Sequence, residues 1–235
     1  MLRVAKAFFF LSIVSSSAIS GEEFAIREKL RALFPEQTIS SVKVSVLPNL
    51  YEVPISSSVF YVSADGRYLF HGELIDTENR INLSEETRAF ARKTFFESID
   101  GSDLIQFTPA DGDIVETLYV YTDIDCSYCR KFHRDVDKLI GAGIAVQYLA
   151  FPRSGSGSES FEKAVNVWCS PNRQKALTDA KEGRRVDSPA CVNPVTKHRG
   201  FGTDMGITGT PAVYNSQGRS LGGYVPADEL IELLR

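Results

Sequence analysis

The spacing of hydrophobic residues changes from helical to strand-like within the first fifty residues. Over residues 22–34 the apolar positions lie three or four apart, and Pro35 follows the run, so this segment is predicted to be an amphipathic helix. Over residues 39–47 apolar and polar residues alternate, with a valine at every second position from 42 to 46. This two-residue period predicts a half-buried strand.

Two further β-rich runs, residues 58–63 and 67–72, lie on either side of Asp65-Gly66. Asp-Gly between two such runs is a strong signal for a β-hairpin. Residues 21–82 are therefore expected to form a small α+β domain with one helix and an antiparallel sheet. About sixty residues bury little surface and leave a sheet edge uncovered, so we expect the chain to form a homodimer through this domain.

A second helical pattern begins after Asn82 and runs to about Ser98. Ser84 is expected to cap its N-terminus, because acidic residues follow in the first turn. The apolar residues expected on one side of this helix are Phe90, Ala91, Phe95 and Ile99. A helix that joins two domains is a semi-rigid spacer, and we assign residues 83–103 to this linker.

The remainder of the chain, residues 104–235, alternates strands and helices. A strand over 113–123, a helix that begins near Cys126 and a strand over 144–151 form a β–helix–β unit, which predicts two parallel strands. A mostly polar helical stretch then precedes a hairpin over 211–222. The other helices are expected at residues 160–169, at 172–182, after Pro194 and at 227–234.

The motif Cys126-Ser127-Tyr128-Cys129 lies where the first of these strands ends and the helix begins. The unpaired N–H groups and the positive dipole end of a helix favour a thiolate at Cys126, and the thiolate is the species that attacks a disulfide. Cys129, one turn later, can then attack the mixed disulfide and release the partner. A C-x-x-C between a strand and a helix predicts a thioredoxin-like α/β domain, here with a helical insertion, in a chain that is α+β as a whole. The cysteines carry the electrons themselves, so no cofactor is expected.

Two other interpretations of this motif are open on the sequence. It could be half of a zinc site, although zinc normally requires a second cysteine pair of similar spacing. Cys169 and Cys191 do not have that spacing, and His133 or His198 could complete such a site only by a coincidence of folding. The motif could also be an inert crosslink in an exported binding module. The strand before it and the amphipathic helix after it favour the redox interpretation, without a metal.

The composition and the first twenty residues indicate the class of protein and its cellular compartment. The hydrophobic content of 43% and charged content of 24% are those of a globular protein, and the net charge of −4 disfavours a nucleic-acid partner. Residues 1–20 combine Arg3 and Lys6 with an apolar run over 7–14 and a tail of small residues, which predicts a signal peptide cleaved before Gly21. The alternative is a buried N-terminal helix. We expect an exported protein.

Export determines how the four cysteines are interpreted. Four cysteines allow three pairings. In an oxidising compartment the pair that does not begin a helix should form a lasting bond, so Cys169 and Cys191 are assigned to a structural disulfide, and Cys126 and Cys129 to the reactive dithiol. Closing the loop between Cys169 and Cys191 is expected to stabilise the fold by about 3 kcal/mol.

A second site element is Thr210-Pro211, at the start of the last hairpin. A proline that opens a strand is a candidate for a cis peptide bond, although most X-Pro bonds are trans. With a cis bond, the Thr210 backbone could pair with an extended substrate strand beside the active cysteine. Thr210, Pro211, Ser127 and Tyr128 are therefore the expected substrate-binding residues.

In several segments the chain resembles a known family, the bacterial periplasmic disulfide isomerases of the DsbC type (DsbC/DsbG). The matching segments are residues 60–66, 121–129, 148–153 and 208–213, and Trp168-Cys169 with the later Cys191. The resemblance implies that Cys126 is an exposed nucleophile, Cys129 its buried resolving partner and Thr210-Pro211 a cis-proline substrate loop. One difference is Ser127, where the family more usually has Gly.

The resemblance also implies a periplasmic homodimer that acts on misfolded or mispaired exported proteins and is kept reduced by a membrane thiol reductase of the DsbD type. Chaperone activity is expected from an apolar dimer cleft. A DsbA-like oxidase and a DsbG-like reductase share the chemistry and are the alternatives. Of the remaining residues, His133 is expected at the surface or its boundary and Trp168 in the core.

Overall fold

The computed structural model describes residues 16–37, 39–110 and 114–235. The chain folds into two compact units, one of residues up to Ile55 with Val59–Gly72, the other of Ser56–Ser58 with Glu73–Arg235. Most of the predicted signal peptide, residues 1–15, lies outside the described residues. Within them, no helix is both long and apolar enough to cross a membrane.

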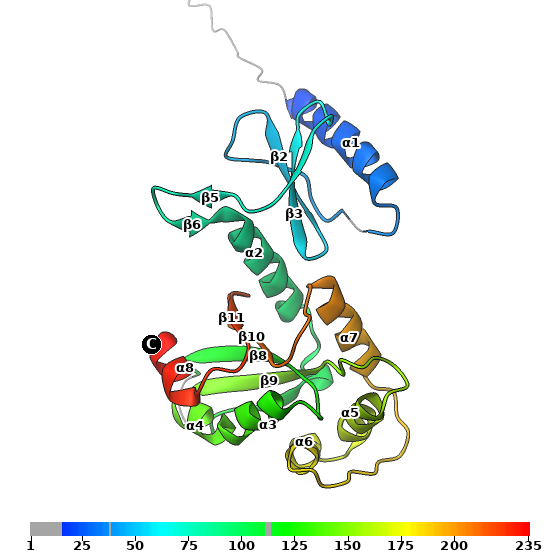
Figure 1. Ribbon diagram of the computed structural model, residues 1–235, viewed down its shortest axis with the longest axis vertical. Helices are drawn as coiled ribbons and strands as arrows, with labels where there is room; N and C mark the ends of the chain where they lie inside the picture. The colour runs from blue at the N-terminus through cyan, green and yellow to red at the C-terminus, as the bar shows by residue number, and fades with distance from the viewer. Residues whose placement is uncertain (1–15, 38, 111–113) are drawn as a thin grey trace, which may run out of the picture. The chain divides into compact units, whose positions relative to one another are not determined.

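The N-terminal unit contains the helix α1 (Ser16–Leu33) and a four-stranded sheet of order β1-β2-β3-β4 (Figure 1). Ile26 and Leu30 of α1 are buried in one core cluster with Val53 and other residues of the sheet. The strands are β1 (Lys43–Val44), β2 (Leu50–Ile55), β3 (Ser58–Ser63) and β4 (Leu69–His71). The hairpin predicted around Asp65-Gly66 is confirmed as the antiparallel pair β3–β4.

The strand predicted over residues 39–47 is wrong for most of its length. Lys43 and Val44 pair with β2 and Ile39 forms an isolated bridge to Ile55, but the segment between them is not paired, and the Val44 side chain is 62% exposed. The longer strand is β2, whose alternate residues are buried, and the sequence pattern missed it because Pro54 interrupts it. Pro54 is tolerated because it lies between the residues that pair with β1, Tyr51 and Glu52, and the bridge from Ile39 to Ile55, and takes part in neither.

The linker helix α2 (Leu83–Glu97) follows the short ribbon of β5 (Ile75–Asp76) and β6 (Ile81–Asn82). The prediction of Ser84 as N-cap is wrong. Asn82 caps the helix by accepting from the Glu85 N–H at 3.0 Å, whereas the Ser84 hydroxyl accepts from the Leu74 N–H at 2.8 Å.

The predicted apolar side of α2 is only partly right. Phe95 and Ile99 pack against a core cluster as predicted, but Phe90 is 63% exposed. The buried residues of this helix include Ala89, Arg92 and Phe96. Arg92 donates to the Gly218 carbonyl at 2.6 Å and lies over the Tyr214 ring, 5.3 Å from its centroid. A buried arginine counts as polar in a hydrophobicity pattern, so the pattern does not place Arg92 on the packed side of the helix.

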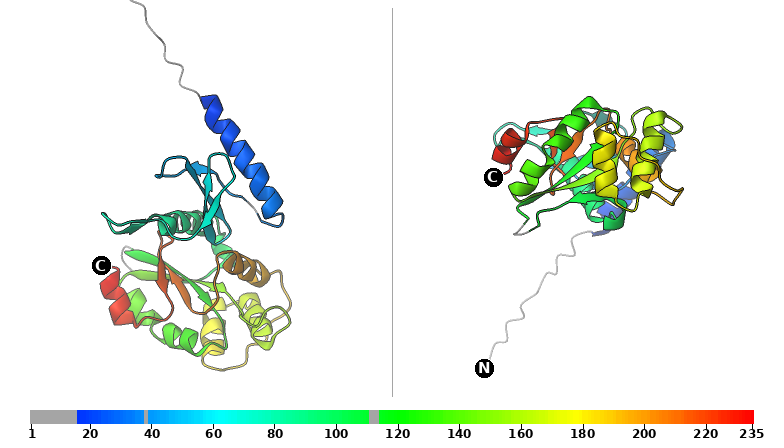
Figure 2. Two further views of the ribbon diagram at one scale, coloured as in Figure 1. Left: turned by 45° about the horizontal axis from the view of Figure 1, so that its top comes forward. Right: turned by 90° about the horizontal axis from the view of Figure 1, so that it is seen from below.

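The C-terminal unit is built on a five-stranded sheet of order β11-β10-β8-β9-β7 (Figures 1 and 2). β8 and β9 are parallel, as predicted, and the other neighbours are antiparallel. Its strands are β7 (Ile105–Phe107), β8 (Glu116–Thr122), β9 (Ile144–Ala150), β10 (Ala212–Tyr214) and β11 (Ser220–Gly222), with the 3-10 helix η1 (Gly101–Asp103) before β7. The α+β fold class is therefore confirmed.

Helices cover both faces of this sheet. The helices α3 and α4 lie on one face, whereas α2 and α7 lie on the other (Figure 1). The helices α5 and α6 pack against each other (Figure 2) and form the predicted helical insertion with α7. The helix bounds are α3 (Ser127–Arg134), α4 (Val136–Gly141), α5 (Glu159–Cys169), α6 (Arg173–Lys181), α7 (Val195–Asp204) and α8 (Ala227–Leu233).

Trp168 lies in the core, as predicted, and its indole N–H donates to the Asp103 carbonyl at 2.9 Å. Successive side chains of β8 point to opposite faces of the sheet and enter two different core clusters. Leu118 and Val120 belong to the cluster that contains Trp168, whereas Tyr121 belongs to the cluster with Phe96 of α2. A strand buried on both faces is expected in the middle of a sheet that is covered by helices on both sides.

Candidate active site

The motif Cys126–Cys129 lies at the end of β8, where the chain turns into α3. Cys126 is the N-cap residue of α3, and its sulfur accepts from the Cys129 N–H at 3.3 Å. An N-cap side chain that accepts from the first turn is held at the positive end of the helix. Both thiols are free, so the structure describes the reduced dithiol.

Cys126 is far less accessible than the expected exposed nucleophile. It is only 4% exposed, and Cys129 is also buried. The Cys126 thiol donates to the Thr210 carbonyl at 3.1 Å, so the loop that precedes β10 partly covers the sulfur. The Thr210–Pro211 peptide bond is cis. The two motifs, 84 residues apart in sequence, therefore meet at one sulfur atom.

The two thiols differ strongly in acidity. Hydrogen bonding from the Cys129 thiol lowers the pKa of Cys126 to about 5, with further contributions from Thr210, the Cys129 N–H and the positive charge of Arg153. Burial raises the pKa of Cys129 well above its ordinary value, and its hydrogen bond to Cys126 adds to this effect. A low pKa on the first cysteine and a high pKa on the second suit a nucleophile and a later resolving group.

Arg153 and Asp123 form a charged pair beside the thiols that the sequence did not identify. The Asp123 carboxylate is buried and accepts from the Arg153 side chain at 3.1 Å and from the Arg153 N–H at 3.0 Å. This hydrogen bonding raises the pKa of Arg153, so the guanidinium keeps its charge near Cys126. The only signal in the sequence was the Asp-rich turn before Cys126.

Two further titratable side chains lie beneath the motif. His133 is buried, so its expected surface position is wrong. Its ring nitrogens contact the Tyr148 hydroxyl at 3.0 Å and the Thr178 hydroxyl at 2.9 Å, and burial lowers its pKa to about 4. Lys181, at the end of α6, is buried as well and donates to Thr122 and to the backbone of Asp123. No pattern in the sequence marked Lys181.

Of the residues expected to bind substrate, the two between the cysteines are exposed. The Tyr128 side chain is 59% exposed, and its ring lies 6.1 Å from the ring of Tyr224. Lys131 lies over the same Tyr224 ring, 4.7 Å from its centroid. An amphipathic ring pair with an adjacent cation offers an apolar surface next to the cysteines.

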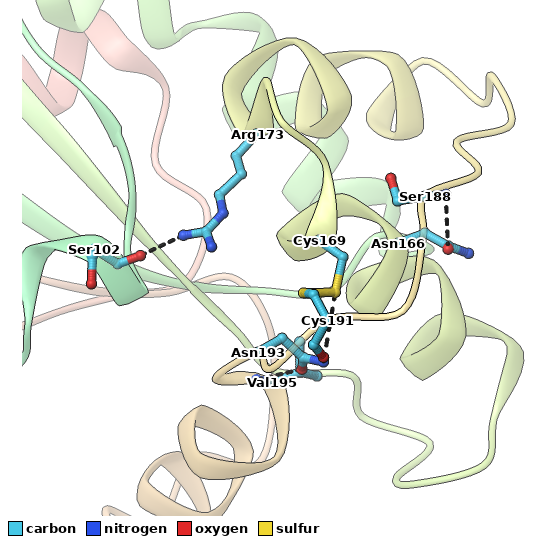
Figure 3. The surroundings of a disulfide bond; sticks show 8 residues. All are labelled: Ser102, Asn166, Cys169, Arg173, Ser188, Cys191, Asn193 and Val195. Atoms are coloured by element: carbon cyan, nitrogen blue, oxygen red, sulfur yellow. Dashed lines mark hydrogen bonds between the residues drawn. A yellow bond between two sulfur atoms is a disulfide. The ribbon is translucent and has the colours of Figure 1, made fainter.

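Cys169 and Cys191 form a disulfide with an S–S distance of 2.01 Å (Figure 3). The bond joins the end of α5 to the segment before α7. The Asn193 side-chain amide donates to the Cys191 carbonyl at 3.2 Å, and its oxygen accepts from the Val195 N–H at 3.2 Å, as Figure 3 shows. This disulfide is separate from the dithiol.

The histidines considered for a zinc site do not join the cysteines. His133 contacts Tyr148 and Thr178, whereas His198 accepts from the Ala150 N–H at 3.2 Å. Among the described residues, no group of three or more His, Cys, Asp or Glu side chains is placed to hold a metal ion.

Comparison with known proteins finds two matching domain families and relatives that span the chain. Residues 16–85 match the family described as the disulfide bond isomerase protein N-terminal domain, and residues 105–235 match the thioredoxin-like domain family. The thiol:disulfide interchange protein DsbC of Salmonella typhimurium is 28% identical over 223 residues, which cover 95% of this chain and 91% of that protein. DsbC of Haemophilus influenzae is 28% identical over 230 residues, which cover 97% of each chain.

One solved structure, a disulfide interchange protein from Neisseria gonorrhoeae, is 29% identical and has a TM-score of 0.52. The match covers 58% of this chain and 96% of that one.

The mixed sheet with a dithiol at a helix N-terminus defines a thiol:disulfide oxidoreductase of the thioredoxin-like class. The two matched domains, taken with the relatives that span the chain, place it more narrowly. The chain belongs to the DsbC family of thiol:disulfide interchange proteins, and its activity is that of a disulfide isomerase. Membership of this family supports a homodimer that acts on other proteins.

Proposed function

We propose that Cys126 is the nucleophile with which this isomerase rearranges mispaired disulfides of exported proteins. The observation that carries the proposal is the position of the Cys126 sulfur, which caps α3 and has a pKa lowered to about 5 by its hydrogen bonds. At neutral pH such a sulfur is a thiolate, whereas an ordinary cysteine is mostly protonated.

The reaction begins when the Cys126 thiolate attacks one sulfur of a substrate disulfide. The Cys126–substrate bond forms, the substrate disulfide breaks, and the second substrate sulfur leaves as a thiolate. That thiolate, or another in the substrate, can attack a second substrate disulfide and release a new thiolate. Finally, a substrate thiolate attacks the substrate sulfur bonded to Cys126. A new substrate disulfide forms, and Cys126 leaves as a thiolate. No net oxidation occurs in this cycle, as isomerisation requires.

If the rearrangement stalls, Cys129 attacks Cys126 and releases the substrate as a reduced dithiol. The enzyme is then left oxidised, with a Cys126–Cys129 bond, and needs an external reductant. A membrane thiol reductase of the DsbD type is the proposed donor of these electrons. The burial of Cys129 supports its role as the second group to react, because its raised pKa keeps it protonated while Cys126 attacks.

The substrate is proposed to lie along the loop at Thr210 and Pro211. The contact between the Thr210 carbonyl and the Cys126 sulfur supports this position, because an extended chain that pairs with Thr210 would lie beside the thiolate. Ser127 and the exposed Tyr128 would contact the same chain from the α3 side. Backbone pairing is independent of side chains, which suits an enzyme with many substrates.

We also propose a location and a domain organisation for the protein. Residues 1–20 would direct export to the periplasm and be removed. Residues 21–82 would form the homodimer, residues 83–103 the linker and residues 104–235 the catalytic domain. Chaperone activity would follow if the dimer presents apolar surface to unfolded chains.

The test is the refolding of scrambled ribonuclease with the reduced protein. Wild type is expected to restore ribonuclease activity, Cys126→Ser to restore none, and Cys129→Ala to accumulate a mixed disulfide visible by non-reducing electrophoresis. Cys169→Ala with Cys191→Ala is the matched control, because it removes two sulfurs but leaves the dithiol. Normal rescue by Cys126→Ser would overturn the proposal, and oxidation of reduced ribonuclease without rescue of the scrambled form would identify an oxidase.

A further inference from the structure

Lys181 is a buried lysine directly beneath the active-site motif. Its Nζ donates to the Thr122 hydroxyl at 2.7 Å and to the Asp123 carbonyl oxygen at 2.7 Å, both at the C-terminal end of β8. Lysine is almost never fully buried unless it is paired. Neither acceptor is charged, and among the described residues Lys181 forms no ion pair with a carboxylate.

The Asp123 carbonyl oxygen connects Lys181 to the active-site motif. This oxygen accepts from Lys181 at 2.7 Å and from the Cys126 N–H at 3.3 Å, and the Cys126 sulfur in turn accepts from the Cys129 N–H at 3.3 Å. The charge of Lys181 also lowers the pKa of Cys129, against the dominant effect of burial. Lys181 is therefore a buried positive group that the fold holds at the strand end from which the dithiol begins.

The other titratable groups around Lys181 either have partners of their own or are neutral. The Asp123 carboxylate is paired with Arg153, and Arg130 of α3 donates to the Ile124 carbonyl at 3.1 Å. His133 is buried, and burial, together with the charge of Lys181, lowers its pKa to about 4, so it is neutral near pH 7. The two remaining groups that act on Lys181 are the sulfurs of Cys126 and Cys129.

The resolving step needs a charge that the motif alone does not supply. Cys129 must lose its proton to attack the mixed disulfide, yet burial holds that proton. Once Cys126 is bonded to a substrate it is neutral, and its thiolate no longer competes for the positive charge nearby. A buried ammonium group then acts on the Cys129 sulfur alone, in surroundings of low dielectric constant where its effect is strong.

We propose that Lys181 is a positioning residue for the resolving step, whose ammonium group stabilises the Cys129 thiolate after the mixed disulfide has formed. The Cys129 proton passes to solvent, the Cys129 thiolate attacks the Cys126 sulfur, the Cys126–substrate bond breaks, and the substrate leaves as a thiolate. Two enzyme sulfurs are oxidised and the substrate disulfide is reduced. The inference rests on the proposed roles of Cys126 and Cys129.

A cavity between α3 and α6 supports this role. Ser127 and His133 of α3 line it together with Thr178 and Lys181 of α6. Lys181 therefore borders a cavity beside the helix that carries Cys129. Burial lowers the pKa of Lys181 to about 8, so the amine is mostly charged near pH 7.

The test measures the resolving step by itself. The reduced protein is mixed with Ellman's reagent at one equivalent, and stopped-flow absorbance follows the second equivalent of 2-nitro-5-thiobenzoate that Cys129 releases from Cys126, over a range of pH. Lys181→Met keeps the length of the side chain and removes the charge. It is expected to slow this release about tenfold at pH 7 and to move its pH profile upward by about one unit, since tenfold corresponds to one pKa unit.

Lys175→Met is the matched control, because Lys175 lies on the same helix but is exposed and paired with Asp179. It should leave the profile unchanged. A Lys181→Met profile that coincides with wild type overturns the inference. A lower plateau rate at high pH with an unchanged midpoint, or an equal loss in the alkylation rate of Cys126, also overturns it, because either result indicates a general disturbance of the fold.

Two additions keep the test decisive. If Lys181→Met lacks the wild-type fluorescence of Trp168, Lys181→Gln, which retains a hydrogen-bond donor, is measured in its place under the same criteria. Cys129→Ala distinguishes this inference from the proposed function. If Cys129→Ala abolishes the release and the Lys181 variant leaves it unchanged, only the role of Lys181 is overturned. If Cys129→Ala still releases the reporter, the assigned role of Cys129 fails.

Discussion

The environment of Cys126 determines the pH range in which its thiolate is available. Its pKa is lowered from the ordinary value to about 5. The thiolate therefore persists as the pH falls from 8 and is lost only as the pH passes through about 5. We expect the rate of alkylation by iodoacetamide to be nearly constant from pH 7 to pH 8 and to fall to half its plateau near pH 5, as measured by mass spectrometry at short reaction times.

The same experiment tests the cause of the shift. The Cys129 thiol makes the largest contribution to the low pKa, so Cys129→Ala should move the half-plateau of Cys126 to higher pH. Lys138→Ala is the control, because its exposed side chain pairs with Asp228 and does not contact the dithiol. A wild-type profile that rises only near pH 8 or 9 would contradict the assigned environment.

Individual site residues differ in how well the sequence identifies them. Cys126 and Cys129 are separated by only two residues, and this spacing indicates the dithiol chemistry, so a sequence motif is sufficient to identify them. Arg153 and Lys181 reach the dithiol only because β8, β9 and α6 end at the same edge of the unit. A local sequence pattern does not show which distant segments come together in the fold. The burial of Cys126 under Thr210 likewise depends on two segments that are far apart in the sequence.

At the scale of elements, the packing of α2 against the hairpin β10–β11 depends on Gly218. A Cβ atom at this position would lie 2.2 Å from the Ala89 carbonyl oxygen and 2.6 Å from the Lys93 nitrogen, both backbone atoms of α2. Gly218 also has a φ of +72°. Gly218→Ala is therefore expected to destabilise the C-terminal unit by about 3 kcal/mol or more, because backbone atoms of a helix cannot move aside.

A second glycine separates the clash from the backbone conformation. Gly222 has a φ of +84°, but a Cβ atom there would meet no atom within 4 Å. Gly222→Ala should therefore lose only about 1 kcal/mol, the cost of a left-handed conformation. Urea unfolding followed by the fluorescence of Trp168, the single tryptophan, measures both variants. Equal losses would show that the contact with α2 does not matter.

The disulfide Cys169–Cys191 gives a further prediction at this scale. It closes a separation of 22 residues, and the chain-entropy relation gives about 3 kcal/mol for its contribution. Replacing both cysteines by alanine is expected to lower the free energy of unfolding by about that amount, measured by urea unfolding with Trp168 fluorescence. The alkylation profile of Cys126 should not change, because the disulfide lies outside the dithiol; a changed profile would show that the two are coupled.

Most elements of the C-terminal unit were predictable from the sequence, and the errors have physical causes. Strands β8 and β9 are long, apolar and bounded by turns, so their period and pairing are unambiguous. The buried side of α2 is only partly predictable, because Arg92 packs through its aliphatic stem and donates to the Gly218 carbonyl. In the N-terminal unit, Pro54 interrupts the sequence pattern of strand β2, and of the alternating residues 39–47 only Ile39 and Val42 are buried, whereas Val44 and Val46 are exposed.

At the scale of the whole molecule, the composition of the chain and its strongest motif are sufficient to define the class of protein. The α+β class and the thioredoxin-like domain follow from local patterns and from the handedness and pairing rules of β–helix–β units. How protein chains associate is not a local property. It depends on which apolar side chains remain exposed after folding, and in the N-terminal unit the sequence pattern does not distinguish these from the buried ones.

The exposed apolar residues of that unit predict where two copies meet. β1 and β4 are the outer strands of the four-stranded sheet, and Val44 on β1 and Leu69 and Phe70 on β4 are exposed. Unpaired edge strands with apolar side chains are favourable sites for pairing with another chain. We expect wild type to have twice the mass of one chain by light scattering, and Phe70→Glu to have the mass of one chain at micromolar concentration.

Phe90→Glu is the matched control, because Phe90 is 63% exposed, close to the 56% of Phe70, but lies on α2. The same charge at that site should leave the mass unchanged, since burying an unpaired carboxylate is unfavourable only where the side chain enters the interface. A wild-type mass of one chain would exclude the homodimer. A Phe70→Glu variant that keeps the double mass would place the interface away from β4 while leaving the dithiol chemistry unaffected.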